Sequence, residues 1–396
     1  MYDVSVVSCK TYEMETVRSA MESVLAPLGG LDWVREGMKV LIKPNLVSAH
    51  KPDTAVPTHP SLICALTRML REKGAQVYVA DSPGGPFNGA LMERVYRMTG
   101  MKDAEVYGAQ LNYTTTATLR KAPGAKVARE MLVCDYLSDM DAVINVCKLK
   151  THGMMGMSAA AKNLFGIVPG TVKPEYHFRF PDPMDFARMI VDLGEYVKPV
   201  LHICDAVVGM EGNGPTAGKA RPIGVLLAAS NPHKLDLVCA NMIGCGMVPT
   251  LKAAVERGLT PENVEELRIC GEYPVIPDWD IVRNFRSTVF ASSKKGPIAW
   301  MKNKILPKLM TARPQVRKGE CIGCGKCGEI CPAKAIAMKA TTGKSAPANK
   351  KGIVPEIDTK KCIRCFCCQE FCPVGAMKVK RPGIGRLLQR ERAGRK

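Results

Sequence analysis

The chain of 396 residues has no apolar run near the ~18 residues that a membrane span needs. Its longest apolar run, around residues 222–229, is far shorter, and its start lacks the basic and apolar regions of a secretory signal peptide. These absences exclude an integral membrane protein and predict a cytoplasmic location. The 17 cysteines would stay reduced there, so we interpret them as metal ligands or core residues and not as disulfides.

Several common catalytic motifs are also missing. There is no H-E-x-x-H and no G-x-S-x-G, and the glycines at 209, 212 and 214 do not open a helix as a dinucleotide-binding G-x-G-x-x-G would. Residues 214–219 read G-P-T-A-G-K, one residue short of a Walker A loop, and Ala220 follows where Ser or Thr should bind Mg²⁺. The sequence therefore supports neither a dinucleotide fingerprint nor an ATPase.

Acidic residues are scarce in the last third of the chain. Residues 1–280 carry 29 Lys and Arg against 31 Asp and Glu, whereas residues 281–396 carry 27 against 6. All the net positive charge of +19 therefore belongs to the C-terminal part. We predict a domain boundary near residue 281 and a basic surface that attracts an acidic redox partner.

The basic part contains a doubled cysteine motif. Residues 321–332 read C-x2-C-x2-C-x3-C-P, and residues 362–373 repeat that pattern. Zinc bound by the C-x2-C pairs is the competing interpretation, but it does not account for the x3-C-P endings. Cys367, which lies between two motif cysteines, is interpreted as a small buried residue.

This region resembles the bacterial-type two-cluster ferredoxins over residues 315–380. In such ferredoxins the fourth cysteine of each motif binds the other cluster. The resemblance therefore implies two [4Fe–4S] clusters. The first is assigned to Cys321, Cys324, Cys327 and Cys372, and the second to Cys362, Cys365, Cys368 and Cys331. The predicted segments are an α/β domain at 1–280, a basic linker with a short amphipathic helix at 281–318, the two-cluster ferredoxin domain at 319–380 and a basic tail at 381–396.

The first 280 residues alternate β-branched apolar runs with segments of helical period. Strands are predicted at residues 3–9, 38–43, 75–80, 141–148, 200–204 and 224–228, and helices at 12–28, 60–73, 185–197 and 233–243. This alternation is typical of α/β domains. We predict a mostly parallel sheet covered by helices, followed by a small α+β ferredoxin-like domain.

Polar residues stand directly after the predicted strands or before the helices. In open α/β sheets, ligands bind at the carboxyl ends of the strands, and side chains two residues apart on an extended chain share a face. We predict that seven side chains converge on one pocket for a small anionic ligand: Asn45, His59, Asp81, Lys148, Lys150, His152 and Lys162. The alternative left open is that each one caps its own helix or turn at the rim.

The predicted pocket residues have distinct roles. Lys148 and Lys150 would neutralise the ligand, His152 would move a proton, and Asp81 would orient a lysine or a ligand hydroxyl. These four are the candidate catalytic residues. The candidate ligand-binding residues are Lys43, Asn45, His59, Lys162, Asn163 and Glu211.

The motifs at 43–45, 59–60, 81–84, 148–152, 162–163 and 210–215 resemble those of the domain-of-unknown-function 362 family, over about residues 3–250. Many members of that family carry a C-terminal ferredoxin module like this one. The family's reaction is not generally established, so the resemblance implies a fold and an iron–sulfur module only. It also suggests a distant similarity in fold to the lactate racemase superfamily, whose nickel cofactor does not follow from the fold.

Three functions from different classes compete. The first is an oxidoreductase whose clusters feed electrons to an anionic substrate or a flavin in the N-terminal pocket. The second is an electron carrier or accessory protein whose large domain docks a partner without catalysis. The third is a nucleic-acid or membrane-surface protein, which we disfavour because the basic linker has few aromatics and adjoins an anionic redox module. We favour the first, because a plain carrier needs no large α/β domain with polar strand ends.

Overall fold

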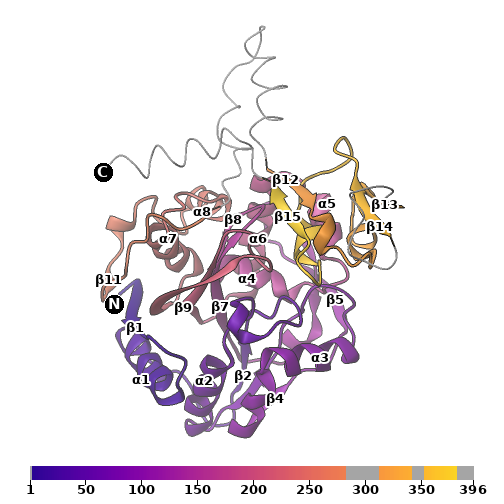
Figure 1. The fold of residues 1–396 in the computed structure, drawn as a ribbon. Helices are drawn as coiled ribbons and strands as arrows, with labels where there is room; N and C mark the ends of the chain where they lie inside the picture. The colour runs from indigo at the N-terminus through magenta and orange to yellow at the C-terminus, as the bar shows by residue number, and fades with distance from the viewer. Residues whose placement is uncertain (1, 282–311, 341–351, 381–396) are drawn as a thin grey trace.

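A nine-stranded sheet forms the centre of the N-terminal region in the computed structural model, which describes residues 2–281, 312–340 and 352–380 (Figure 1). The strand order is β11-β1-β10-β9-β7-β2-β3-β4, and β8 pairs with the end of β7. The strands are β1 (Val4–Ser8), β2 (Lys39–Lys43), β3 (Gln76–Val79), β4 (Ala109–Leu111), β7 (Ala142–His152), β8 (Gly156–Ser158), β9 (Leu201–Glu211), β10 (Lys219–Ala229) and β11 (Ile269–Cys270).

Most neighbouring strands of this sheet are parallel, which confirms the predicted fold class. The run β4-β3-β2-β7-β9 is parallel throughout, and so is β1 with β11. Strand β10 is antiparallel to both β9 and β1, and β8 is antiparallel to β7. A separate antiparallel hairpin is formed by β5 (Ala117–Lys121) and β6 (Glu130–Cys134).

Helices cover both faces of the sheet. They are α1 (Met14–Leu25), α2 (Pro60–Glu72), α3 (Gly89–Thr99), α4 (Ala160–Asn163), α5 (Lys173–Arg179), α6 (Pro183–Val197), α7 (Pro232–Met242) and α8 (Pro249–Val255). Alternate residues of β10 serve the two faces, because side chains of a strand point to opposite sides. Leu226 and Ala228 pack in the core with α1 and α2, whereas Val225 and Leu227 pack with α7 and α8.

Strand β7 is longer than predicted from the sequence. The predicted strand ends at Lys148, whereas β7 continues to His152 with every residue buried. Its end is held by pairing with β8, which places Lys150 opposite Ser158 and His152 opposite Gly156. This extension carries the polar residues of the strand deep into the protein.

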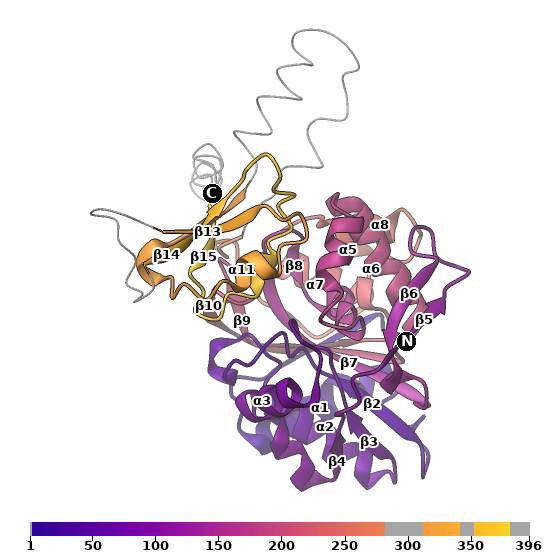
Figure 2. The ribbon, with the colours of Figure 1, turned by 90° about the vertical axis from the view of Figure 1, so that its right-hand side faces the viewer.

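The C-terminal module repeats one small unit. Its helices α11 (Lys326–Glu329) and α12 (Cys367–Glu370) each lie within one cysteine motif, and its strands form two antiparallel pairs. These pairs are β12 (Arg313–Val316) with β15 (Met377–Lys380), and β13 (Ile336–Ala340) with β14 (Ile353–Ile357). Figure 2 shows the module lying against the α/β region beside β8 and α5.

Parts of the predicted C-terminal organisation lie outside the described residues. The predicted amphipathic helix of the linker falls within 282–311, and the basic tail at 381–396 is also outside. Residues 313–316, which the sequence placed in the linker, form β12 and pair with β15. No helix in the described ranges is long and apolar enough to cross a membrane.

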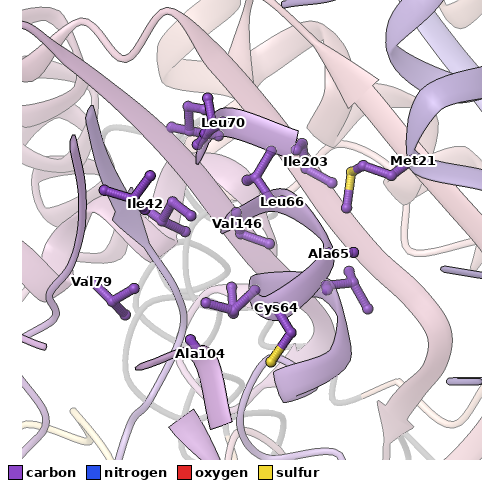
Figure 3. Close-up of a cluster of buried hydrophobic side chains, with 14 of the residues drawn as sticks. Met21, Ile42, Cys64, Ala65, Leu66, Leu70, Val79, Ala104, Val146 and Ile203 are labelled. Carbon is purple, nitrogen blue, oxygen red and sulfur yellow. The ribbon is translucent and has the colours of Figure 1, made fainter. Parts of the chain in front are cut away.

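A substitution in the core beneath α2 tests how helix α2 packs on the sheet. Leu66 is fully buried among side chains that include Val146 and Ile203 (Figure 3). We expect Leu66→Ala to lower the free energy of unfolding by about 2–5 kcal/mol, because it removes buried apolar contact and leaves a cavity. Leu119→Ala is the control, because the side chain of Leu119 is 60% exposed, and its effect should stay within about 0.5 kcal/mol. Equal losses in denaturant titrations would contradict this packing.

Candidate active site

The three residues between Cys368 and Cys372 join the ferredoxin module to the α/β region. Gln369 Nε2 donates a 2.7 Å hydrogen bond to the carbonyl oxygen of Asn213. The side chain of Glu370 faces His152, with 2.8 Å between Oε1 and Nε2. Phe371 packs so closely on Gly84 that a Cβ at residue 84 would overlap its ring. The spacer of the second cysteine motif is therefore the contact surface between the two modules.

Apolar packing extends this interface. Phe366 and Val379 of the ferredoxin module belong to one buried cluster with Met154 and Phe165 of the α/β region. Gly153 touches the ring of Phe366, where a Cβ would lie 3.2 Å from the nearest ring atom. The module is consequently seated where β7 ends.

A small polar cavity of about 70 Å³ lies at this junction, and both modules line it. Lining residues of the α/β region stand after β2 and β3, near the end of β7, on β8, and on α4 and α5, where a parallel sheet opens a crevice. The polar lining residues are Asn45, Ser48, Asp81, Ser82, Lys150, Ser158, Lys162, Asn163, Lys173, His177 and Glu370. Phe371 also contributes to the wall.

A chain of side-chain amides orients the cavity wall. Lys150 Nζ donates to Asn45 Oδ1 and, at 2.8 Å, to the carbonyl oxygen of Val56. Asn45 Nδ2 in turn donates to Asn163 Oδ1 at 2.8 Å, and Asn163 Nδ2 donates to Asn145 Oδ1 at 2.7 Å. Each of the three asparagine Oδ1 atoms thus accepts a hydrogen bond from another side chain. This chain of hydrogen bonds holds Lys150 in one position.

Asp81 lies in a buried ion pair with Lys43. Their Oδ1 and Nζ atoms are 2.8 Å apart, and Asp81 Oδ2 accepts the backbone N–H of Leu46 at 2.9 Å. Lys43 therefore neutralises the carboxylate from behind, while Asp81 itself borders the cavity.

Three further lysines line the cavity, and none of them is in a direct ion pair with a described residue. In the described part of the chain, no carboxylate forms an ion pair with Lys150, Lys162 or Lys173. Burial, followed by the charges of Lys162 and Lys148, lowers the pKa of Lys150 to about 7. Burial also lowers the pKa of Lys173 to about 8 and that of Lys162 in the same direction. The cavity is therefore an environment that favours an anion.

His152 and Glu370 form the polar contact between the modules. His152 Nδ1 accepts the backbone N–H groups of Met154 and Met155, so the neutral ring carries its proton on Nε2, which faces Glu370. Burial lowers the pKa of His152 to about 4. Burial alone would raise the pKa of Glu370, but His152 and Lys162 hold it well below its usual range.

The prediction that seven polar side chains converge on one cavity is wrong for two of them. Asn45, Asp81, Lys150 and Lys162 line the cavity, and His152 adjoins it through Glu370. Lys148 and His59 belong to a separate buried group. There, Lys148 Nζ donates to Tyr12 and Asp205, at 2.7 and 2.8 Å, and His59 stacks on Tyr12.

The physical reason is a break in the strand pairing. The register between β7 and β9 shifts between Lys148 and Lys150, and Asp205 lies opposite Lys148. Lys148 is therefore satisfied inside the sheet. Two candidate ligand-binding residues also lie outside the cavity lining, because Lys43 stands behind Asp81 and Glu211 pairs with Arg221 at 2.9 Å. Asn163, the remaining candidate, lines the cavity.

The lining residues that sequence reasoning missed include two on α5 and two in the second cysteine motif. Lys173 and His177 lie on α5, for which no helix was predicted, although Pro174 at its start is a common helix-opening signal. Glu370 and Phe371 lie inside the second cysteine motif, where they read as spacer residues. Nothing in the cysteine spacing indicates that these side chains face another domain.

The cysteines fit the predicted iron–sulfur clusters. Cys321, Cys324, Cys327 and Cys372 line one cavity, although Cys372 lies about 45 residues further along the chain. In the other group, burial and then the neighbouring thiols of Cys365 and Cys331 raise the pKa of Cys362. The two crossing cysteines also share a local geometry, because Cys331 Sγ accepts the N–H of Ala335 and Cys372 Sγ that of Ala376, both at 3.2 Å. Cubane clusters on these thiolates would supply one-electron redox chemistry.

A substitution at Gly166 tests the packing around the buried ion pair of Lys43 and Asp81. A Cβ at this position would overlap Asp81 Oδ1 and lie 2.5 Å from Lys43 Nζ. We expect Gly166→Ala to destabilise the protein by about 1–3 kcal/mol, because the pair must separate or shift. Gly89→Ala is the matched control, since a Cβ at the start of α3 meets no atom within 4 Å. Equal thermal midpoints for the two variants would contradict the close packing around Asp81.

The ligand crossover is testable by a single substitution. We expect Cys372→Ala to lose the cluster of Cys321, Cys324 and Cys327 and to retain about four of about eight irons. Anaerobic iron and sulfide analysis with electron paramagnetic resonance of the reduced protein measures this. Cys270→Ala, in β11, is the control and should keep all the iron. Loss confined to the cluster of Cys362, Cys365 and Cys368 would refute the crossover.

Comparisons with known proteins agree with this architecture. The model of the family described as "Domain of unknown function (DUF362)" matches residues 40–241, and the model of a 4Fe-4S dicluster domain matches residues 320–376. The thylakoid-associated protein sll1697 of Synechocystis sp. (strain ATCC 27184 / PCC 6803 / Kazusa) is 30% identical over 271 residues. That match covers 66% of this chain and 81% of the relative.

Two solved structures show weaker similarity. The lactate racemase apoprotein from Thermoanaerobacterium thermosaccharolyticum has a TM-score of 0.40 at 13% identity, covering 63% of this chain and 58% of that one. A protein from Thermotoga maritima has a TM-score of 0.34 at 14% identity, covering 55% and 56%. The chain thus spans less than two thirds of either structure. The family matches confirm both sequence resemblances: the protein belongs to the DUF362 family and carries an iron–sulfur domain of the 4Fe-4S dicluster type.

Proposed function

We propose that the protein is an oxidoreductase in which two [4Fe–4S] clusters exchange electrons with a small anionic substrate in the cavity between the modules. The main support for this proposal is that residues of both modules line the cavity. Glu370 and Phe371 line it, and they stand between Cys368 and Cys372, which are the predicted ligands of different clusters. Glu370 is two residues from either cysteine, which is at most about 7 Å along an extended backbone.

The lysines define what the cavity binds. Lys150, Lys162 and Lys173 offer ammonium groups to one small space, and ammonium groups bind carboxylate and phosphate oxygens by charge-assisted hydrogen bonds. The lowered pKa values of Lys150 and Lys173 also suit these two groups to give and regain a proton near neutral pH. The cavity of about 70 Å³ by itself holds only a small anionic group, because pockets for whole drug-sized or cofactor-sized ligands measure roughly 300–1,000 Å³.

The basic composition of the C-terminal part favours an acidic protein as the electron donor. Residues 281–396 carry 27 basic against 6 acidic residues, so an acidic electron donor would be steered to this end of the protein. We propose that electrons enter through the C-terminal part of the chain and leave through the cavity that Glu370 and Phe371 line.

Oxidation of the reduced clusters by small molecules tests the function. Chemically reduced protein is mixed anaerobically with the dialysable fraction of a cell extract, and the visible absorbance of the clusters is followed. We expect oxidation in the unaltered protein, and at least about tenfold slower oxidation in the double variant Lys162→Gln, Lys173→Gln, since one lost charged contact is worth about tenfold.

Lys73→Gln provides the matched control, because Lys73 is exposed and pairs with Asp32 far from the cavity lining. The iron content of all variants should be equal. Equal rates in the unaltered protein and the double variant, including no oxidation of either, would contradict the proposal. That result would favour an electron carrier whose large domain docks a partner.

A further inference from the structure

A second, wider space between the modules adjoins the polar cavity. This crevice measures about 460 Å³ and shares Ser48, Gly84, Glu370 and Phe371 with the cavity. Its outer part contains apolar side chains, among them Leu91, Ile330 and Pro373, together with Arg94. Cys372 also lines it, so the crevice runs past a predicted cluster ligand. A ligand with a small polar end and a larger body would fill both spaces.

The inner cavity has a surplus of positive charge when its lysines are protonated. Lys43 cancels Asp81, and Glu370 offsets one of the three remaining lysines. The four ammonium groups and two carboxylates around the cavity therefore leave two positive charges when every lysine is protonated. A single carboxylate would neutralise only half of this surplus, whereas a dianion would match it.

The cavity also contains an unsatisfied polar atom. His177 lines it and is buried, and its Nδ1 has no hydrogen-bond partner among the described residues. Its ring is stacked on Phe186 with 4.4 Å between the ring centroids, so it is held in place without a polar contact at that atom. Buried polar atoms are normally paired, and a ligand oxygen or hydroxyl would supply the missing partner.

The size of the cavity limits the charged group. A volume of about 70 Å³ accommodates roughly five water molecules, at about 10–15 Å³ each. That space suits the few oxygens of a phosphate group or a short dicarboxylate. The rest of a larger ligand must lie in the crevice.

We propose that the substrate carries a dianionic oxygen group, a phosphate or a short dicarboxylate, which binds between Lys150, Lys162 and Lys173 while its body lies in the crevice beside Cys372. This assignment rests on the proposed function, because it names the class of substrate that the same site takes. It also separates recognition from reaction. The lysines hold the charged group, and the body lies next to the cluster predicted on Cys321, Cys324, Cys327 and Cys372.

Calorimetric titration of the full-length protein with oxidised clusters tests the assignment without any electron transfer. The probes are inorganic phosphate, malonate and, as a singly charged control, acetate, at neutral pH. We expect at least one of the two dianions to bind at least about tenfold more tightly than acetate. Phosphate binding alone would indicate a phosphate ester as substrate, and malonate binding alone a dicarboxylate.

The variants connect the binding to the cavity. Lys162→Gln and Lys173→Gln should each weaken dianion binding by about tenfold, and Lys73→Gln should leave it within about twofold. Equal iron content and thermal midpoints would show that the variants are folded. The proposal would be overturned if acetate bound the unaltered protein as tightly as both dianions, or if neither dianion bound it. Dianion binding of equal strength in the unaltered protein and the two cavity variants would also overturn it.

The two proposals can fail separately. Dianion binding at the lysines without oxidation of the clusters by the extract would refute the oxidoreductase and leave the dianion site standing. Lysine-dependent oxidation by the extract without dianion binding would refute the dianion assignment and leave the oxidoreductase standing.

Discussion

The three residues between Cys368 and Cys372, the spacer of the second cysteine motif, join the ferredoxin module to the α/β region and to the cavity. The thiolates at either end of this spacer must face the clusters, so its three residues are exposed to whatever packs against the module. Here all three contact the α/β region: Gln369 at the loop after β9, Glu370 at His152 and Phe371 at Gly84. A segment of three residues thereby fixes the predicted cluster ligands, the domain interface and one wall of the cavity relative to one another.

The α/β region meets this spacer with a strand end that is unusually polar for a buried position. Lys150 and His152 are fully buried on β7, and each is held by a hydrogen bond or close contact from a different element. Burying charged groups costs free energy. Proteins commonly retain such groups where a ligand or a reaction needs the charge. The lysines around the cavity differ in this respect from Lys148, whose charge is balanced by Asp205 at 2.8 Å.

The sequence predicted the elements of the fold and part of the cavity. The alternation of strands and helices predicted the mostly parallel sheet, and the polar strand ends predicted that Asn45, Asp81, Lys150 and Lys162 would meet. It could not separate Lys148 from Lys150, because the register shift between them depends on pairing with β9. It could not find Glu370 and Phe371 either. Their role depends on how the ferredoxin module sits on the α/β region, and this orientation leaves no periodic pattern in the chain.

We propose that the lysine cavity lies within electronic reach of the predicted clusters. Pulsed electron–nuclear double resonance on the reduced protein with saturating inorganic phosphate measures this directly, through the coupling between a cluster spin and the phosphorus nucleus. We expect a phosphorus coupling in the unaltered protein that disappears in the double variant Lys162→Gln, Lys173→Gln. A reduced, phosphate-saturated protein without such a coupling would contradict it.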